Sequence, residues 1–513
     1  MLNLFDQRVA QRCWDLLGLA MPQRTRLTLP ASLSCPGCRH NRVAHRERGQ
    51  GIQMRVRVSM LVMLFLTASA TAKPPAETAF DEWLDAFNRN DRAVLTEFNA
   101  RRFGEPDHNI EYLLDSGEET GGLDVIHVER SEPLEFVALT RERNFPVERR
   151  ITVKLEEAGS LRLEHITQDP LQIPQAKALE AFDAFATQLA AADRFSGVLV
   201  IEQNGQRLYA KAFGRANRED DIPVQLDTPF LFASQGKMFT AVAVLQLVDA
   251  GKVGLDDPIG KFLADYPNRE MAAVTIRQLL SHQGGTGDIG VLQPDEGRNR
   301  AWVRSIDDLI KLNGDRAPQF PPGSQFEYSN YGFLLLGAVV EAVSGQSYYD
   351  YVAEHIFAPA GMTATRFPTL EQMGDVARGY TQTDDGTLAP SVDQLPWRGT
   401  PAGGGVTTAD DEVRFVDALR AGKLIPLPLL EEAIKQQTDW YGYGFIASGP
   451  DEFPHWGHGG SAPGNSAALS IYPSNDMTMV CLSNRDPPVC DRLLTRLHWH
   501  LSPPPAPGDA LER

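Results

Sequence analysis

Two strand-turn-strand patterns bracket the larger part of this 513-residue chain. In the first, apolar runs within residues 198–213 flank Asn204-Gly205, the dipeptide most typical of a tight hairpin turn. In the second, apolar runs within residues 467–482 flank a Pro-Ser-Asn-Asp turn. Long apolar helical patterns lie between the two hairpins. The arrangement predicts one antiparallel sheet assembled from both ends of the segment, with a helical lobe inserted in the middle.

This sheet and lobe define a predicted domain of residues 177–502, which opens and closes with a helix. Residues 76–168 form a second, smaller α+β pattern, in which helical segments precede four short β-rich runs. The pattern predicts an antiparallel meander with helices on one side and loosely resembles the nuclear-transport-factor-like cone fold. A spacer or substrate-shaping accessory role is its simplest interpretation. A Pro-containing linker, 169–176, joins the two, and residues 503–513 form a flexible tail.

Composition excludes several classes of protein. With 42% hydrophobic and 23% charged residues the chain has the content of a folded protein. Its formal charge of -18 repels nucleic-acid backbones, so we expect no nucleic-acid partner. No stretch reaches the roughly 20 apolar residues needed for a stable membrane span.

The first 72 residues differ from the rest. Residues 1–53 are rich in arginine and lack hydrophobic periodicity. From Met54 the chain has a basic start, a short apolar run and the small-residue site Ala70-Thr71-Ala72, which together are typical of a secretory signal peptide. We therefore interpret residues 1–53 as a wrongly assigned extension and residues 54–72 as a signal peptide. This predicts a periplasmic or secreted protein.

Cysteine positions leave two questions open. After removal of residues 1–72 only Cys481 and Cys490 remain, and they could pair in an oxidising compartment. Alternatively, Cys481 in its apolar run is a buried free thiol. If the first residues are a genuine cytosolic prefix, Cys35 and Cys38 with two nearby histidines could hold zinc, although a single C-x-x-C is a weak motif.

Ser234 and Lys237 open the first apolar helical pattern of the lobe. Residues three apart on a helix share a face, so the Lys237 amine is expected beside the Ser234 hydroxyl. A serine hydroxyl is a weak nucleophile that needs a nearby base, and a lysine among apolar groups can provide one because desolvation lowers its pKa. Alone this S-x-x-K pattern is weak, since Ser234 could simply cap the helix.

Tyr328 and Asn330 precede a second apolar helical pattern. Their alternation in an extended or turn segment lets both side chains point into one cleft. A phenol near a cationic lysine can relay protons, and an asparagine amide can orient a substrate carbonyl. The structural alternative is a tyrosine packed on the following helix, with Asn330 as its N-cap.

A glycine-rich stretch, His458-Gly459-Gly460-Ser461, comes just before the last hairpin. Glycines on an edge strand let a substrate lie against the backbone, and a main-chain N–H there can bind an oxyanion. The alternative is a plain turn between strands.

In this order the three motifs resemble those of the penicillin-recognising serine hydrolases, in the branch with class C β-lactamases, D,D-peptidases and related esterases. The resemblance covers roughly residues 177–500. It implies an α+β fold, a β-lactamase/transpeptidase-like antiparallel sheet with a helical lobe, here preceded by the small α+β domain. It also implies a small ester, amide or peptide substrate, with no metal or other cofactor.

The resemblance implies a role for each motif residue. Ser234 would attack an acyl carbonyl and form an acyl-enzyme. Lys237 and Tyr328 would share the proton transfers, and which of them is the base stays open. Asn330 would hold the acyl amide of the substrate, and the backbone N–H groups of Ser234 and Ser461 would form the oxyanion hole.

One departure from the family pattern concerns the substrate. The β-lactamases usually carry K-T-G or K-S-G where this chain has His458-Gly459-Gly460, and a mostly neutral imidazole beside a bare glycine attracts a carboxylate less well. We therefore expect hydrolysis of esters or of amide and peptide bonds, with D,D-peptidase or β-lactamase activity as the alternative. A cation from another loop, for which Arg398 is a candidate, would weaken this argument.

Other classes of protein fit less well. An α/β-hydrolase needs G-x-S-x-G, and the nearest candidate has Pro463 in place of the last glycine. The residues after 72 contain no H-E-x-x-H metal motif. A family member that binds cell-wall peptide without turnover stays open, although the presence of every motif residue argues against it. The natural substrate and the oligomeric state also stay open.

Overall fold

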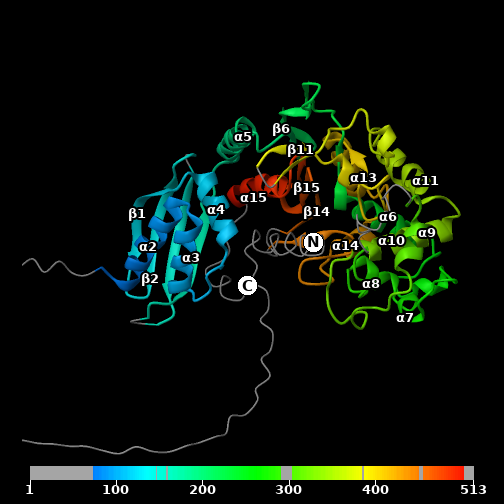
Figure 1. Cartoon of the computed structure of the whole chain (residues 1–513), viewed down its shortest axis with the longest axis horizontal. Helices are drawn as coiled ribbons and strands as arrows, with labels where there is room; N and C mark the ends of the chain where they lie inside the picture. Colours follow the sequence, from blue (N-terminus) through cyan, green and yellow to red (C-terminus); the bar gives the residue numbers. More distant parts are fainter. Residues whose placement is uncertain are drawn as a thin grey trace, which may run out of the picture.

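The computed structural model describes residues 73–145, 147–157, 160–289, 303–383, 386–449 and 454–501. These residues form a smaller and a larger body that lie side by side (Figure 1). The predicted extension, signal peptide and C-terminal tail lie outside the described residues. Within the described ranges, no helix combines the length and the apolar character needed to cross a membrane.

The smaller body packs three helices on a four-stranded sheet (Figure 1). Its elements are α2 (Pro75–Arg89), α3 (Arg92–Arg102), α4 (Ile110–Thr120), β1 (Leu123–Ser131), β2 (Glu135–Glu142), β3 (Glu148–Leu155) and β4 (Leu163–Pro170). The strands pair antiparallel in sequence order, as the meander pattern predicts. Helix α4 is not among the predicted elements, and Gly117 in its second half has low helix propensity.

The larger body is built on a six-stranded antiparallel sheet in the order β13-β14-β15-β16-β5-β6. The strands are β5 (Gly197–Gln203), β6 (Gln206–Phe213), β13 (Ile446–Ser448), β14 (His455–Ala462), β15 (Asn465–Tyr472) and β16 (Met477–Ser483). Asn204 and Gly205 both have positive φ, 51° and 69°, as the predicted two-residue turn requires. Because β16 pairs with β5, the predicted assembly of the sheet from both chain ends is confirmed.

Helices cover the sheet on both sides. Apolar residues of α5 (Gln175–Ala191) and α15 (Val489–Leu501) form one core cluster with the outer face of the sheet. A disulfide between Cys481 and Cys490, with Cα atoms 5.3 Å apart, joins β16 to α15. The structure thus has the cysteine pair that the sequence left open.

The helical lobe lies on the other face. Its helices are α6 (Gly236–Asp249), α7 (Arg269–Ala272), α8 (Ile276–Leu280), α9 (Ile306–Asn313), α10 (Asn330–Ser344), α11 (Tyr348–Val352), α12 (Ala358–Ala360), α13 (Ala409–Arg420) and α14 (Leu427–Ala433). Short strand pairs complete the body: β7 (Arg215–Asn217) with β8 (Ile222–Pro223), β9 (Phe230–Leu231) with β12 (Val406–Thr407), and β10 (Tyr380–Gln382) with β11 (Leu388–Pro390).

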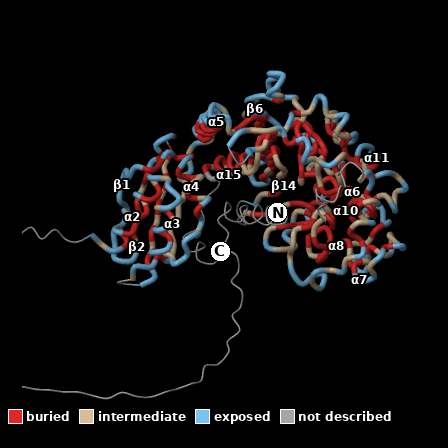
Figure 2. Tube along the Cα trace, in the orientation of Figure 1, coloured by how far each residue is buried: buried red, intermediate tan, exposed pale blue. Residues whose placement is uncertain are grey.

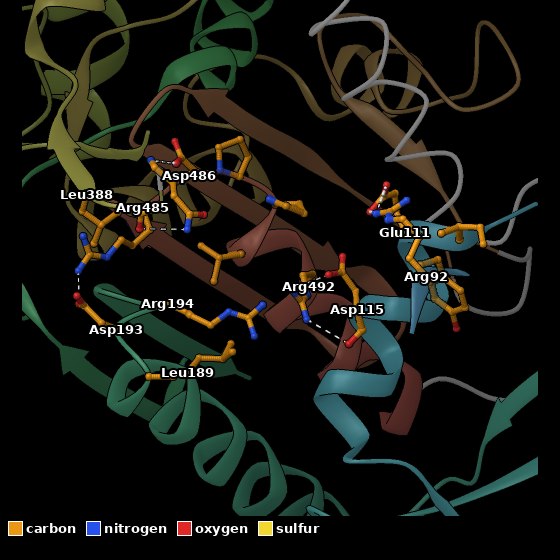
Figure 3. Close-up of a pocket in the computed structure, with 18 of the residues that line it drawn as sticks. Arg92, Glu111, Asp115, Leu189, Asp193, Arg194, Leu388, Arg485, Asp486 and Arg492 are labelled. Atoms are coloured by element: carbon orange, nitrogen blue, oxygen red, sulfur yellow. Dashed lines mark hydrogen bonds and ion pairs between the residues drawn. The ribbon is translucent and has the colours of Figure 1, made fainter. Parts of the chain in front are cut away.

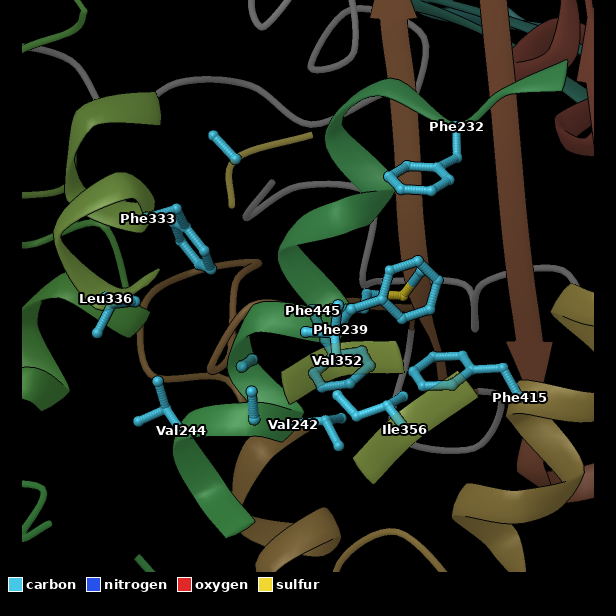
Figure 4. Close-up of a cluster of buried hydrophobic side chains, with 14 of the residues drawn as sticks. Phe232, Phe239, Val242, Val244, Phe333, Leu336, Val352, Ile356, Phe415 and Phe445 are labelled. Atoms are coloured by element: carbon cyan, nitrogen blue, oxygen red, sulfur yellow. The ribbon is translucent and has the colours of Figure 1, made fainter. Parts of the chain in front are cut away.

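Helix α6 runs through the centre of this lobe. Its residues are apolar on nearly every side, and Phe239 packs among Phe357 and Phe415 in the cluster drawn in Figure 4. A helix that is hydrophobic all round is stable only inside a core. The packing therefore holds the N-terminal end of α6, where Ser234 and Lys237 lie, in a fixed position.

The two bodies meet at α15. Arg492 reaches α4, where its Nε lies 2.7 Å from a carboxylate oxygen of Glu119. Arg496 pairs with Glu142 of β2, and Glu142 also accepts a 2.7 Å hydrogen bond from Arg149 Nε. The side chains of Glu142 and Arg149 are completely buried, and that of Arg496 is 2% exposed. Figure 2 shows the buried trace of α15 continuing toward the smaller body.

Apolar contact accompanies these ion pairs. Phe145 and Val147, from the β2–β3 connection of the smaller body, belong to the same core cluster as α5 and α15. A cavity of about 590 Å³ remains beside the junction, between the start of α4, the end of α5 and the segment around Arg485 (Figure 3). The two bodies therefore share a hydrophobic core and a buried ionic network.

Candidate active site

Ser234 lies in a 3-10 turn, Ala233–Gln235, that leads directly into α6. Ala233 has a φ of 43°, in the left-handed region that non-glycine residues seldom adopt. Two close backbone approaches hold this turn: a Cβ on Gly403 would lie 2.1 Å from the Ala233 carbonyl oxygen, and one on Gly460 would lie 2.2 Å from that of Phe232. Glycine is required at both places. Strained backbone that is held from two sides is typical of functional sites.

The Lys237 side chain is buried beside Ser234, as the three-residue spacing predicts. Its Nζ lies 3.3 Å from Ser234 Oγ, 2.7 Å from Asn330 Oδ1 and 2.9 Å from the carbonyl oxygen of Ala402. The amide and carbonyl oxygens can only accept hydrogen bonds. Asn330 Oδ1 and Ala402 O therefore accept hydrogen bonds from the Lys237 amine, which also lies within hydrogen-bond distance of the serine hydroxyl.

Tyr328 and Asn330 approach Lys237 from α10 and the segment before it. The Tyr328 ring centroid lies 4.6 Å from Lys237 Nζ. The N-cap of α10 is Ser329, whose Oγ accepts a 2.9 Å hydrogen bond from Gly332 N, so the alternative that made Asn330 the N-cap is wrong. The Asn330 amide is therefore available to the site.

Two further residues, which the motif analysis did not select, support this arrangement. Asp288 carboxylate oxygens accept hydrogen bonds from Asn330 N and Nδ2, at 3.2 and 3.3 Å. His282 is buried, accepts a 3.1 Å hydrogen bond from Ser329 N at Nδ1, and packs its ring 4.3 Å from that of Tyr328. Burial, with Lys237 and His458 nearby, holds the pKa of His282 well below its ordinary value, so its imidazole is neutral.

Only the glycine-rich run before Asp288 marks this loop in the sequence, and glycines alone do not indicate a role for the aspartate. The contact depends on how the α8–α9 connection folds back onto α10.

The third motif forms strand β14 and not a turn. Strand β13 pairs only with residues 455–457, so residues 458–462 lie at the sheet edge on that side. His458 is 4% exposed; its Nδ1 donates a 2.6 Å hydrogen bond to Gly459 O, and its Nε2 accepts from the Tyr441 hydroxyl at 2.9 Å. Burial, reinforced by Lys237, lowers the pKa of His458 to about 3. Gly459 faces the other way, since a Cβ there would lie 3.3 Å from Asp491 Oδ1.

A cleft of about 200 Å³ opens in front of Ser234. Of the predicted site residues, Ser234, Asn330 and Ser461 line it, whereas Lys237, Tyr328 and the His458–Gly460 stretch lie outside the lining. The rest of the lining is mostly apolar and comes from the segments on either side of the Ser234 turn: Leu231, Ala233, Ile289, Pro368, Leu370, Met373, Leu395, Pro396, Trp397, Arg398, Gly399, Thr400, Ala402, Gly403, Gly404 and Ala462. The arrangement suits attack by a serine on a small acyl group.

The sequence pattern of the Beta-lactamase family matches residues 182–501, more than half of the chain. The chain belongs to this family. The match begins within α5 and ends with α15, so it includes the sheet, the helical lobe and the three motifs, and it excludes the smaller body.

Named relatives agree with the family match. Penicillin-binding protein 4 of Amycolatopsis lactamdurans is 29% identical, with the alignment covering 60% of this chain and 84% of the relative. Esterase EstB of Burkholderia gladioli is 30% identical over 51% of this chain and 73% of the relative. A penicillin binding protein from Bacillus halodurans superposes with a TM-score of 0.55 and 28% identity, covering 61% of this chain and 99% of that structure. The predicted β-lactamase/transpeptidase-like fold is confirmed, and the chain is a serine hydrolase of this family.

Proposed function

We propose that this protein is an exported serine hydrolase that cleaves esters, or amide and peptide bonds, through an acyl-enzyme on Ser234. The observation that carries the proposal is the hydrogen-bond geometry of Lys237. Asn330 Oδ1 and Ala402 O occupy two N–H directions of its amine, at 2.7 and 2.9 Å. In its neutral form the amine can accept the Ser234 hydroxyl proton, because Nζ lies 3.3 Å from Ser234 Oγ. Removal from water favours the neutral form of an amine, so this position suits a base.

In the proposed reaction, Ser234 Oγ forms a bond to the substrate carbonyl carbon as its proton passes to the Lys237 amine. Tyr328, whose ring packs against that amine, relays the proton to the leaving group as the scissile bond breaks. Water then attacks the acyl-enzyme and gives up a proton along the same route. The acid product leaves, and the Ser234 hydroxyl is restored.

The remaining motif residues bind and orient the substrate in this proposal. The backbone N–H groups of Ser234 and Ser461, both at the cleft, donate to the oxyanion, and Gly460 allows β14 to lie against the nucleophile turn. Asn330, held by Asp288, orients the acyl group. The pKa of His458, lowered to about 3 by burial, leaves the third motif uncharged, which supports esters or amides over β-lactams.

Export rests on the signal-peptide pattern from Met54. We assign residues 76–168 an accessory role, because the smaller body lies outside the family match and far along the chain from the motif residues. N-terminal sequencing of the native protein is expected to begin at Lys73, and recovery of peptides from residues 1–53 would contradict this start.

Labelling with a fluorophosphonate probe tests the nucleophile. Mass spectrometry is expected to find one adduct, on the peptide that contains Ser234, and loss of 4-nitrophenyl ester hydrolysis in Ser234→Ala. Ser461→Ala is the matched control, because only the backbone of Ser461 is used, and it should keep both labelling and turnover. Labelling of Ser461 or Ser281 would refute the assignment, and stoichiometric binding without turnover would favour a binding protein.

A further inference from the structure

Arg398 is the only charged side chain among the described residues that line the Ser234 cleft. The wall on which it lies, residues 395–400, is otherwise apolar or uncharged. A guanidinium on the wall of a small cleft keeps its charge at every physiological pH. This wall is separate from β14, which contributes Ser461 and Ala462.

The orientation of Arg398 is fixed by neutral groups. Its Nε donates a 2.8 Å hydrogen bond to Phe367 O, and its guanidinium carbon lies 3.6 Å from the centroid of the Tyr349 ring. Tyr349 is itself held, because its hydroxyl donates a 2.8 Å hydrogen bond to Gly399 O. Stacking and one hydrogen bond therefore orient the guanidinium plane, and neither of these two contacts with described residues uses a terminal nitrogen.

Those terminal nitrogens have no ion-pair partner within the ranges that the structure describes. Other half-buried arginines of the larger body do have one: Arg366 pairs with Asp375, and Arg420 with Asp476. A planar, pre-oriented pair of N–H groups is the donor arrangement that matches a carboxylate. Because Arg398 lines the cleft, its guanidinium can supply the donor side of such a pair, and a substrate can supply the acceptor side.

We propose that Arg398 binds a carboxylate of the substrate, so that this hydrolase prefers esters or amides whose acyl chain ends in a short carboxylate. The inference rests on the proposed function of Ser234. Arg398 and Ser234 line the same cleft of about 200 Å³, so a short acyl chain is expected to join the carboxylate to the scissile carbonyl. The anion is held by the wall of residues 395–400, since neutral His458 at the edge of β14 does not attract it.

Two esters that differ in one group test this inference: 4-nitrophenyl pentanoate, which ends in a methyl group, and mono-4-nitrophenyl glutarate, which ends in a carboxylate. Loss of a charge-assisted hydrogen bond is expected to lower kcat/KM for the glutarate ester about 10- to 100-fold in Arg398→Gln. The pentanoate ester should change less than about threefold, because it makes no such bond. For the glutarate ester, kcat/KM of Arg398→Lys should lie between the values of the wild type and of Arg398→Gln, because lysine keeps the positive charge but lacks the planar pair of N–H groups.

Arg304→Gln is the matched control. Arg304 stacks on Trp397 at the same wall, 4.1 Å from the ring centroid, but is exposed and lies outside the cleft lining. The Arg304→Gln substitution removes a positive charge close to the cleft, as Arg398→Gln does. It should leave the ratio of kcat/KM for the glutarate ester to that for the pentanoate ester unchanged.

Three outcomes would overturn the inference. Equal losses for both esters in Arg398→Gln would mean that Arg398 only shapes the cleft. An unchanged kcat/KM for the glutarate ester in Arg398→Gln would show that Arg398 does not bind the carboxylate, and an equal fall of the glutarate-to-pentanoate ratio in Arg304→Gln would reduce the effect to general attraction. Failure of the proposed function is distinguishable, because the wild-type protein would then hydrolyse neither ester and Ser234 would take no fluorophosphonate.

Discussion

Basic side chains are buried in two regions of this protein, and the partners described for them differ in kind. At the cleft, three hydrogen bonds of Lys237 go to neutral oxygens, from a hydroxyl, an amide and a backbone carbonyl. At the domain junction, Arg149 and Arg496 both pair with the Glu142 carboxylate. A carboxylate holds a positive charge in place, whereas neutral oxygens orient an amine without fixing its proton. The first region is thus suited to proton transfer and the second to structural attachment.

Among the variants that test this comparison, Lys237→Met is expected to have the largest effect, a loss of kcat/KM. Loss of the base should lower kcat/KM for a 4-nitrophenyl ester about 100- to 10,000-fold. The melting temperature should change less than in Arg496→Met, because methionine is similar in length to lysine and the hydrogen bonds lost at Lys237 Nζ include those to neutral oxygens of Ser234, Asn330 and Ala402. Turnover near the wild-type level would remove Lys237 from the chemistry.

Arg496→Met tests the opposite region. Arg496→Met leaves Glu142 paired with Arg149 but removes one buried charge-assisted hydrogen bond of its carboxylate, so the free energy of unfolding should fall by about 1.5–3 kcal/mol. The kcat/KM of the folded protein should remain within about threefold of wild type, because Arg496 is not among the described residues that line the cleft. Urea unfolding and active-site titration measure the two quantities separately. A large loss of kcat/KM per titrated active site would mean that the junction acts on the active site.

The acid limit of stability gives a smaller effect. Burial opposes ionisation of Glu142, but Arg149 and Arg496 outweigh it, so the pKa of Glu142 lies below its ordinary 4.5. A lowered folded-state pKa contributes stability that is present above that ordinary value and is lost as the pH falls through the folded-state value. The melting temperature should therefore fall on acidification below about pH 4.5, and less steeply in Glu142→Gln, measured by calorimetry. Parallel pH curves would contradict the assignment.

The smallest effect is expected from an exposed ion pair near the junction. Arg92 and Glu111 lie 2.7 Å apart beside the interdomain cavity, with side chains 59% and 51% exposed. Because water screens both charges, Arg92→Ala should cost less than about 1 kcal/mol by urea unfolding. If Arg92→Ala lowered the free energy of unfolding as much as Arg496→Met does, burial would not distinguish the Arg92–Glu111 pair from the Arg496–Glu142 pair.

Much of the larger body could be predicted from local sequence. The Asn204-Gly205 turn requires two positive φ angles, which those residues adopt easily, and the hairpin then fixes its own register. The approach of Lys237 to Ser234 needs only helical spacing. The resemblance to the family depends on the order of the three motifs, because each motif alone has a plain structural alternative.

What the sequence did not predict depends on contacts between distant segments. The Ala402 carbonyl is a backbone atom, so no residue type marks it, and it reaches Lys237 only after the lobe has folded. The neutral state of His458 follows from burial beside Tyr441, which a motif does not contain. The junction likewise joins Glu142 to Arg496, and charge composition cannot indicate which of many ion pairs is buried.

The pairing of β16 with β5 also sets the order in which this protein can be completed. The two strands are about 280 residues apart, and long-range strand pairing is slow because the intervening chain must first be ordered. During synthesis β5 and β6 leave the ribosome before β16. Until β16 is available they can form only a two-stranded hairpin, which is marginally stable alone. A ribosome-bound chain that ends before residue 477 lacks the central strand and the helix that docks the smaller body. The sheet of the larger body can therefore be completed only after residues 477–501 have left the ribosome.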